Sequence, residues 1–162
     1  MSVAQTANTV VSADTATILV SAEGATTLTY FAVDNAGNQE AARTMTVRID
    51  TTAPLVSCAA SPDRLWPPDR RLVPVTVSII ATDAVAGVAD VTLSAVRVNE
   101  PNATASDVAG FDVGSSSVSG QLRAIRDGAG TGREYALTYQ AHDFAGNAAT
   151  CTALVTVPHD QR

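Results

Sequence analysis

The sequence predicts an all-β protein, and three observations support this prediction. Ala, Val and Thr are abundant while aromatic residues make up only 4% of the 162 positions, and Val and Thr suit pleated strands. No long window shows the period of an amphipathic helix. The motif L-T-Y-x-A-x-D-x-A-G-N occurs twice, beginning at Leu28 and at Leu137, which lie 109 residues apart.

Each copy of this motif is predicted to form a β-hairpin. The alternating residues up to the Asp indicate a strand. The Asp side chain can accept hydrogen bonds from the amides of a tight turn, in which Gly and Asn tolerate a positive φ. A second apolar alternation follows each copy, at Met45, Val47 and Ile49 and at Ala153, Val155 and Val157. The chain therefore carries one structural unit repeated about every 109 residues.

The spacing fits an immunoglobulin-like sandwich, which takes roughly 100 residues. The hairpin resembles the last two strands, F and G, of bacterial immunoglobulin-like domains, and the second copy with its surroundings resembles hyalin-repeat-type modules of secreted bacterial proteins. The resemblance covers nearly all of residues 53–162 and, more loosely, residues 1–52. Besides the hairpin, the matching residues are Thr52-Ala53-Pro54, Cys58, Leu65-Trp66-Pro67-Pro68, Ala81-Thr82-Asp83, Asn99-Glu100-Pro101 and Cys151.

We therefore expect a complete immunoglobulin-like β-sandwich at residues 53–162, preceded by a partial module at 1–52 that holds only the later strands. In the first segment, strands are predicted at about 8–12, 16–22, 26–34 and 42–50. In the second they are predicted at about 55–60, 73–82, 88–98, 108–113, 118–126, 133–143 and 148–158. The alternation shifts between Val91/Leu93 and Val96/Val98, which predicts a β-bulge.

Composition limits the partners. The net charge is −6, all ten basic residues are Arg, and no basic patch is visible, so nucleic acid is not an expected partner. No apolar run approaches the roughly 20 residues of a membrane span. Residues 1–5 lack the features of a signal peptide. The expected partners are neighbouring modules of a parent protein, together with self-association through residues 1–52, whose sheet would have unpaired edges.

The two cysteines flank the second module. In the modules that the sequence resembles, such a pair joins the first strand to the last, so the resemblance implies a Cys58–Cys151 disulfide and an oxidising compartment. Two reduced, buried thiols in a cytosolic protein are the alternative. We favour the disulfide, and with it a secreted or cell-surface location.

No catalytic motif is apparent. The two histidines, His142 and His159, lie at no recognisable spacing from a nucleophile, and no G-x-S-x-G occurs. Surface histidines are the favoured interpretation, and an enzyme is not expected.

A calcium site is a more serious candidate. Asp83 and Asp143 continue the inward parity of their strands and should lean over the same end of the core. Glu23 and Asp50 of the first segment complete a set of carboxylates that would suit this hard cation. However, each Asp can instead cap its own turn, which explains the D-x-A-G-N spacing without metal, and capping is favoured.

The opposite end of the second module is a candidate ligand-binding surface. A Trp among loop prolines and charges can bind a sugar or a peptide. The candidate residues are Trp66, Asp69, Arg70, Glu100, Arg126 and Arg133. A Trp that plugs the end of a core poor in aromatics, with arginines paired locally, is the favoured alternative.

The predicted function is structural. The chain is interpreted as a non-catalytic spacer of a larger secreted or surface protein. The rival hypothesis is an adhesin-type or carbohydrate-binding module that uses the Trp66 end.

Overall fold

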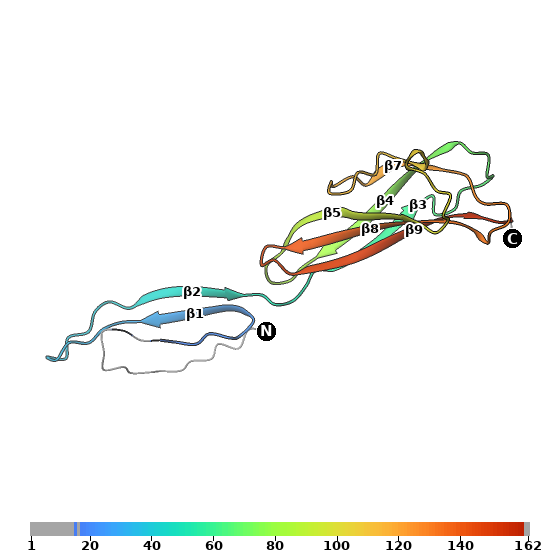
Figure 1. Cartoon of the computed structure of the whole chain (residues 1–162). Coiled ribbons are helices and arrows are strands. Elements are labelled where there is room, and N and C mark those ends of the chain that lie inside the picture. Colours follow the sequence, from blue (N-terminus) through green and yellow to red (C-terminus); the bar gives the residue numbers. More distant parts are fainter. Residues whose placement is uncertain (1–14, 16, 161–162) are drawn as a thin grey trace. The chain divides into compact units, whose positions relative to one another are not determined.

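A computed structural model describes residues 15 and 17–160, which divide into two compact units between Thr51 and Thr52. Both units consist of antiparallel β-sheets, as predicted, and Figure 1 shows the strands in chain order. No helix in the described part of the chain is long and apolar enough to cross a membrane.

The first unit contains a two-stranded antiparallel sheet of β1 (Gly24–Tyr30) and β2 (Arg43–Ile49). These strands correspond to the predictions at 26–34 and 42–50. The strand predicted at 16–22 is wrong in its described part, because residues 17–22 pair with no described strand. The prediction at 8–12 lies outside the described residues.

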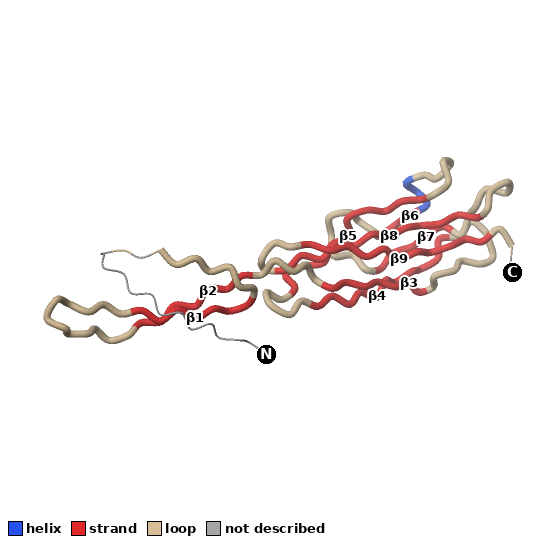
Figure 2. The backbone as a smooth tube through the Cα atoms, turned by 90° about the horizontal axis from the view of Figure 1, so that it is seen from below, coloured by secondary structure: helices blue, strands red, loops and turns tan. Residues whose placement is uncertain are grey.

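The second unit contains a four-stranded sheet in the order β3-β4-β7-β6. Its bounds are Leu55–Ser61 for β3, Leu72–Thr82 for β4, Val108–Ala109 for β6 and Ser119–Arg123 for β7. A single 3-10 turn, η1 (Ala105–Asp107, blue in Figure 2), precedes β6. The crossing segment, residues 99–118 between β5 and β7, thus forms a much shorter strand than the predicted 108–113, since its Ser- and Gly-rich sequence favours turns.

A three-stranded sheet in the order β5-β8-β9 completes the second unit. The strands are β5 (Val88–Val98), β8 (Gly132–Asp143) and β9 (Ala148–Pro158), with β8 in the middle. The register of β5 against β8 shifts between Leu93 and Ala95, which confirms the predicted bulge. A second shift lies between Val88 and Asp90.

One hydrophobic core takes side chains from both sheets of the second unit. In β8, buried and half-buried residues alternate along the whole strand, and every second residue from Arg133 to Asp143 is buried. The four-stranded sheet contributes Val75 and Val77 of β4 and Leu122 of β7. This alternation is what a strand with one face on the core requires.

Two links join the edges of these sheets. The predicted disulfide is confirmed: Cys58 of β3 bonds to Cys151 of β9, with their Cα atoms 5.8 Å apart. Beyond β3, the chain crosses to the other sheet, where the N–H of Leu65 donates to the carbonyl of Thr156 at 2.8 Å and the N–H of Thr156 donates to Asp63 at 2.8 Å. Strand β3 and the residues that follow it thereby contact both sheets.

Candidate functional site

The turn between β8 and β9 is held by the carboxylate of Asp143. Its Oδ1 accepts the N–H groups of Ala145 and Asn147, each at 2.8 Å, and its Oδ2 accepts the side-chain amide of Asn147 at 2.8 Å. Gly146 has a φ of 93°, which residues with a Cβ rarely adopt. Asp143 is only 3% exposed, and this burial would raise its pKa, but the hydrogen bonds to Asn147, Ala145 and Gly146 outweigh burial and lower it.

The first unit builds the same turn between β1 and β2. The Oδ1 of Asp34 accepts the N–H groups of Ala36 at 2.9 Å and Asn38 at 2.8 Å, and its Oδ2 accepts the Asn38 side chain at 2.8 Å. The Asn38 side chain is the main cause that lowers the pKa of Asp34. The repeated motif therefore specifies one local structure, around an exposed Asp in the first unit and a buried Asp in the second.

Asp83 caps the turn between β4 and β5. Its Oδ1 accepts three backbone N–H groups, from Val85 at 3.1 Å, Ala86 at 2.8 Å and Gly87 at 2.7 Å. Turn capping thus accounts for the position of both Asp83 and Asp143, as the sequence favoured.

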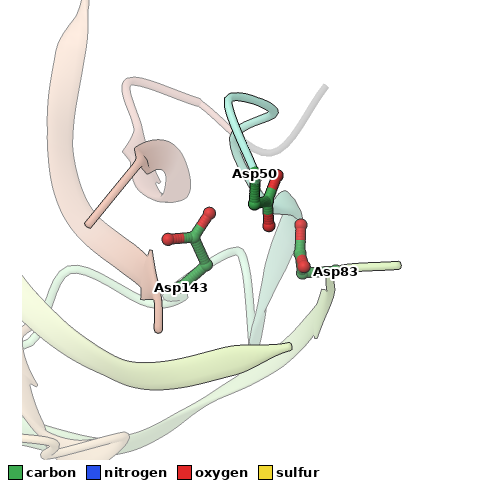
Figure 3. A group of neighbouring side chains, drawn as sticks. All are labelled: Asp50, Asp83 and Asp143. Atoms are coloured by element: carbon green, nitrogen blue, oxygen red, sulfur yellow. The ribbon is translucent and has the colours of Figure 1, made fainter. Parts of the chain in front are cut away.

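The second unit also brings these two carboxylates together. Ligand oxygens of Asp83 and Asp143 lie within 4.8 Å of each other (Figure 3). In the first unit, Glu23 and Asp50 directly flank the terminal cross-strand pair of Gly24 and Ile49, so they belong to one end of that hairpin. Each unit therefore offers two of the predicted carboxylates, and such oxygen donors suit a hard cation such as calcium.

At the other end of the second unit, a buried ion-pair network surrounds Arg133. This residue is 2% exposed and lies near the start of β8. Its Nε donates to Glu100 at 2.7 Å, its Nη1 to Asp107 at 2.8 Å and its Nη2 to Asn102 at 3.1 Å. Buried charges are tolerated when each is paired and hydrogen-bonded in this way.

The network extends to a second arginine. Arg123 of β7 donates from Nε to the other carboxylate oxygen of Asp107 at 2.9 Å. Burial would raise the pKa of Asp107, but hydrogen bonds from the N–H of Thr104 and from both arginines lower it. Tyr135 donates its hydroxyl to the carbonyl of Arg123 at 2.8 Å, and burial raises its pKa. The network thus ties β8, β7 and the crossing segment together.

This network contains only some of the residues that were predicted to bind a ligand. Glu100 and Arg133 are buried against each other and hold the fold. Asp69 is exposed and pairs with Arg71 at 3.5 Å. The plug interpretation of Trp66 is wrong, because Trp66 is 40% exposed whereas the adjacent Leu65 is buried in the core. Leu65 occupies the core position at this end, and the indole ring of Trp66 lies at the surface.

Two members of the predicted set share a surface hollow. Arg70 and Arg126 line it together with Pro68 and Ile125. Arg70 has a φ of 67°, so it adopts the left-handed conformation. The Nε atom of Arg126 is buried and has no hydrogen-bond partner in the described part of the chain.

The histidines are placed at the surface or near it. His142 points its Nδ1 at Asp90, 3.0 Å away, on the outer face of the β5-β8 pair. His159 lies in the exposed tail, with Nε2 3.2 Å from the carbonyl of Gly128. Neither contact forms a recognisable nucleophile–base pair.

The sequence interpretation missed the role of Asp107. A signal was available, because Arg133 shares the inward parity of Tyr135 and Leu137, and an inward Arg requires buried acidic partners. Its partner Asp107 was not identifiable, since it lies in an irregular segment without periodicity.

Comparison of the sequence with family models and with curated proteins gives no match.

Proposed function

We propose that the chain is a non-catalytic spacer segment, made of immunoglobulin-like modules, of a larger secreted or cell-surface bacterial protein. The observation that carries this proposal is the repeated turn: Asp34 and Asp143 are bonded in the same way in two consecutive units. Tandem copies of one compact unit are typical of extended arrays. The proposed location is supported by the disulfide, since disulfides persist in oxidising compartments.

The strand order supports the immunoglobulin-like assignment of the second unit. Constant-type immunoglobulin domains place strands A, B, E and D in one sheet and C, F and G in the other. The orders β3-β4-β7-β6 and β5-β8-β9 match this arrangement. On this assignment, β1 and β2 correspond to strands F and G of the partial first module.

The disulfide gives the spacer proposal a mechanical test. Cys58 and Cys151 lie on the first and last strands of the second unit and are 93 positions apart in sequence. A force applied to the two chain ends therefore passes through the S–S bond, and the residues between the cysteines bear none of it. A load-bearing spacer benefits from this arrangement because its extension is limited.

The test is single-molecule force extension of the whole chain. We expect the oxidised protein to lengthen only by the residues outside the 58–151 loop. With reductant, the loop should add roughly 305–335 Å, from the 93-position separation and about 3.3–3.6 Å per extended residue. The C58S/C151S double variant should show the longer extension without reductant. An oxidised protein that extends as far as this variant would contradict a load-limiting role.

A further inference from the structure

We propose that the second unit binds an oxyanion group, a carboxylate or a phosphate, in the hollow lined by Pro68, Arg70, Ile125 and Arg126. The inference goes beyond the spacer role and does not depend on it. The hollow has a volume of about 210 Å³. This is below the roughly 300–1,000 Å³ of pockets that enclose a drug-sized ligand, so it suits one charged group of a longer molecule.

The backbone holds both walls of the hollow in place. The N–H of Arg70 donates to the carbonyl of Ala124 at 2.9 Å, and the N–H of Ala124 donates to Arg71 at 2.8 Å. These bonds continue the pairing of β4 with β7 beyond Leu72. The carbonyl of Arg70 also accepts a bond from Arg123 at 2.9 Å. Arg70 is therefore fixed in a left-handed conformation that is unfavourable for a residue with a Cβ.

The charges around the hollow are unbalanced. Neighbouring arginines have acidic partners: Arg71 pairs with Asp69 at 3.5 Å and Arg123 with Asp107 at 2.9 Å. Within the described part of the chain, Arg70 and Arg126 form no salt bridge. Two like charges on residues that line one hollow repel each other, and an anion between them would relieve the repulsion.

Arg126 has unused hydrogen-bonding capacity. Its Nη1 makes only a long contact of 3.4 Å with the carbonyl of Asp127, so the terminal nitrogens keep donor capacity, whereas its Nε is buried out of a ligand's reach. Among the described residues, Arg126 forms no salt bridge with the adjacent Asp127, whose Oδ1 accepts the N–H of Ala129 at 3.0 Å. A guanidinium presents several donors in a planar fork that matches carboxylate and phosphate oxygens.

The surroundings indicate what should carry the anion. Pro68 and Ile125 give the hollow an apolar part, and Trp66, in the same loop as Pro68, is 40% exposed. Aromatic and apolar surfaces of this kind pack against sugar rings and carbon chains. The ligand class is therefore an oxyanion carried on a carbon skeleton, either a uronate-containing saccharide or a polyol phosphate.

The test uses the fluorescence of Trp66, the only Trp of the chain, together with calorimetry. The oxidised full-length chain is titrated with trigalacturonate, with glycerol 3-phosphate, and with maltotriose as an uncharged control. We expect at least one anion to bind, maltotriose not to bind, and binding to weaken as salt is added. If trigalacturonate binds more tightly, the ligand carries a carboxylate; if glycerol 3-phosphate binds more tightly, it carries a phosphate.

Matched variants assign the binding to the hollow. Arg126→Gln removes one charge, and Arg70→Gly removes the other while tolerating the left-handed backbone. Arg97→Gln makes the same charge change at an exposed position on β5. We expect each hollow variant to weaken binding at least tenfold and Arg97→Gln to leave it unchanged, with the melting temperature of each variant confirming its fold.

The proposal is overturned if calorimetry detects binding of neither anion, if maltotriose binds as tightly as the anions, or if folded hollow variants bind like the unmodified chain. The force-extension result for the spacer role does not involve this hollow. Failure of one proposal is therefore distinguishable from failure of the other.

Discussion

Tyr30 and Tyr139 occupy the same position of the repeated motif, yet Tyr139 is completely buried while Tyr30 is 49% exposed. In the second unit, this face of the hairpin is covered by the core residues of β4 and β7. In the described part of the first unit, no second sheet covers the equivalent face, and Met45, opposite Leu28, is 52% exposed. The apolar face of the β1-β2 hairpin, with Tyr30 and Met45, is therefore accessible to solvent.

We therefore predict that residues 1–162 self-associate through the first unit, whereas residues 53–162 are monomeric. Strand β1 contains no charged residue or proline that would discourage pairing along its edge. Light scattering on both chains is the measurement. Thr27→Lys on β1 should return the full chain to a monomer, and Thr150→Lys on β9 should not. A strictly monomeric full chain would instead favour docking of residues 1–52 on their own second unit.

The second prediction concerns the buried network. Arg133→Met should lower the free energy of unfolding by about 3–5 kcal/mol, because Glu100 and Asp107 lose their partner inside the protein. Arg97→Met, at an exposed site on β5, should change it by less than about 0.5 kcal/mol. Urea unfolding of the two variants provides the comparison. Equal, small effects would show that the network does not stabilise the fold.

The third prediction concerns pH. The pKa of Asp107 is lowered by its hydrogen bonds, which outweigh the effect of burial. A lowered folded-state pKa adds stability above the unfolded value of about 3.9, and this stability is lost as pH falls through the folded value. We therefore expect the free energy of unfolding to fall below about pH 4. Asp107→Asn, measured by urea unfolding across this range, should flatten the decline, and an unchanged slope would assign it to other carboxylates.

The fourth prediction concerns calcium. Asp83 and Asp143 lie within 4.8 Å of each other, and a lowered pKa keeps Asp143 charged at neutral pH. A cation near the pair would relieve their repulsion, so we expect excess calcium to raise the melting temperature of the second unit relative to chelator. Asp83→Asn retains a turn-capping oxygen but loses the charge, and should abolish the calcium response.

Two outcomes would separate metal binding from capping. Coincident melts of the unmodified chain in calcium and in chelator would leave turn capping as the whole role of these residues. Asp143→Ala should lower the melting temperature under either condition, because its turn loses the cap. Asp50→Ala tests whether the first unit contributes a ligand: an unchanged calcium response would exclude it.

The strands of the second unit were predictable from sequence because each has one face on the core. Val75 and Val77 in β4, and Tyr135 to Ala141 in β8, alternate as a half-buried strand must, and the phase shift near Leu93 revealed the bulge. The turn at Asp143 was equally predictable from the sequence, since its hydrogen bonds join residues within four positions of one another. Such local patterns depend on neighbouring residues and hardly on the rest of the chain.

Only the tertiary structure decided which charges meet. Arg133 reaches Glu100 and Asp107 across 33 and 26 sequence positions, from a strand into an irregular segment that carries no periodic signal. The same holds for the loop that contains Trp66, where the packing of the loop against the core buries Leu65 and leaves the indole exposed. Alternation assigns a residue to a face of a sheet, but the partner it meets depends on how distant segments pack in three dimensions.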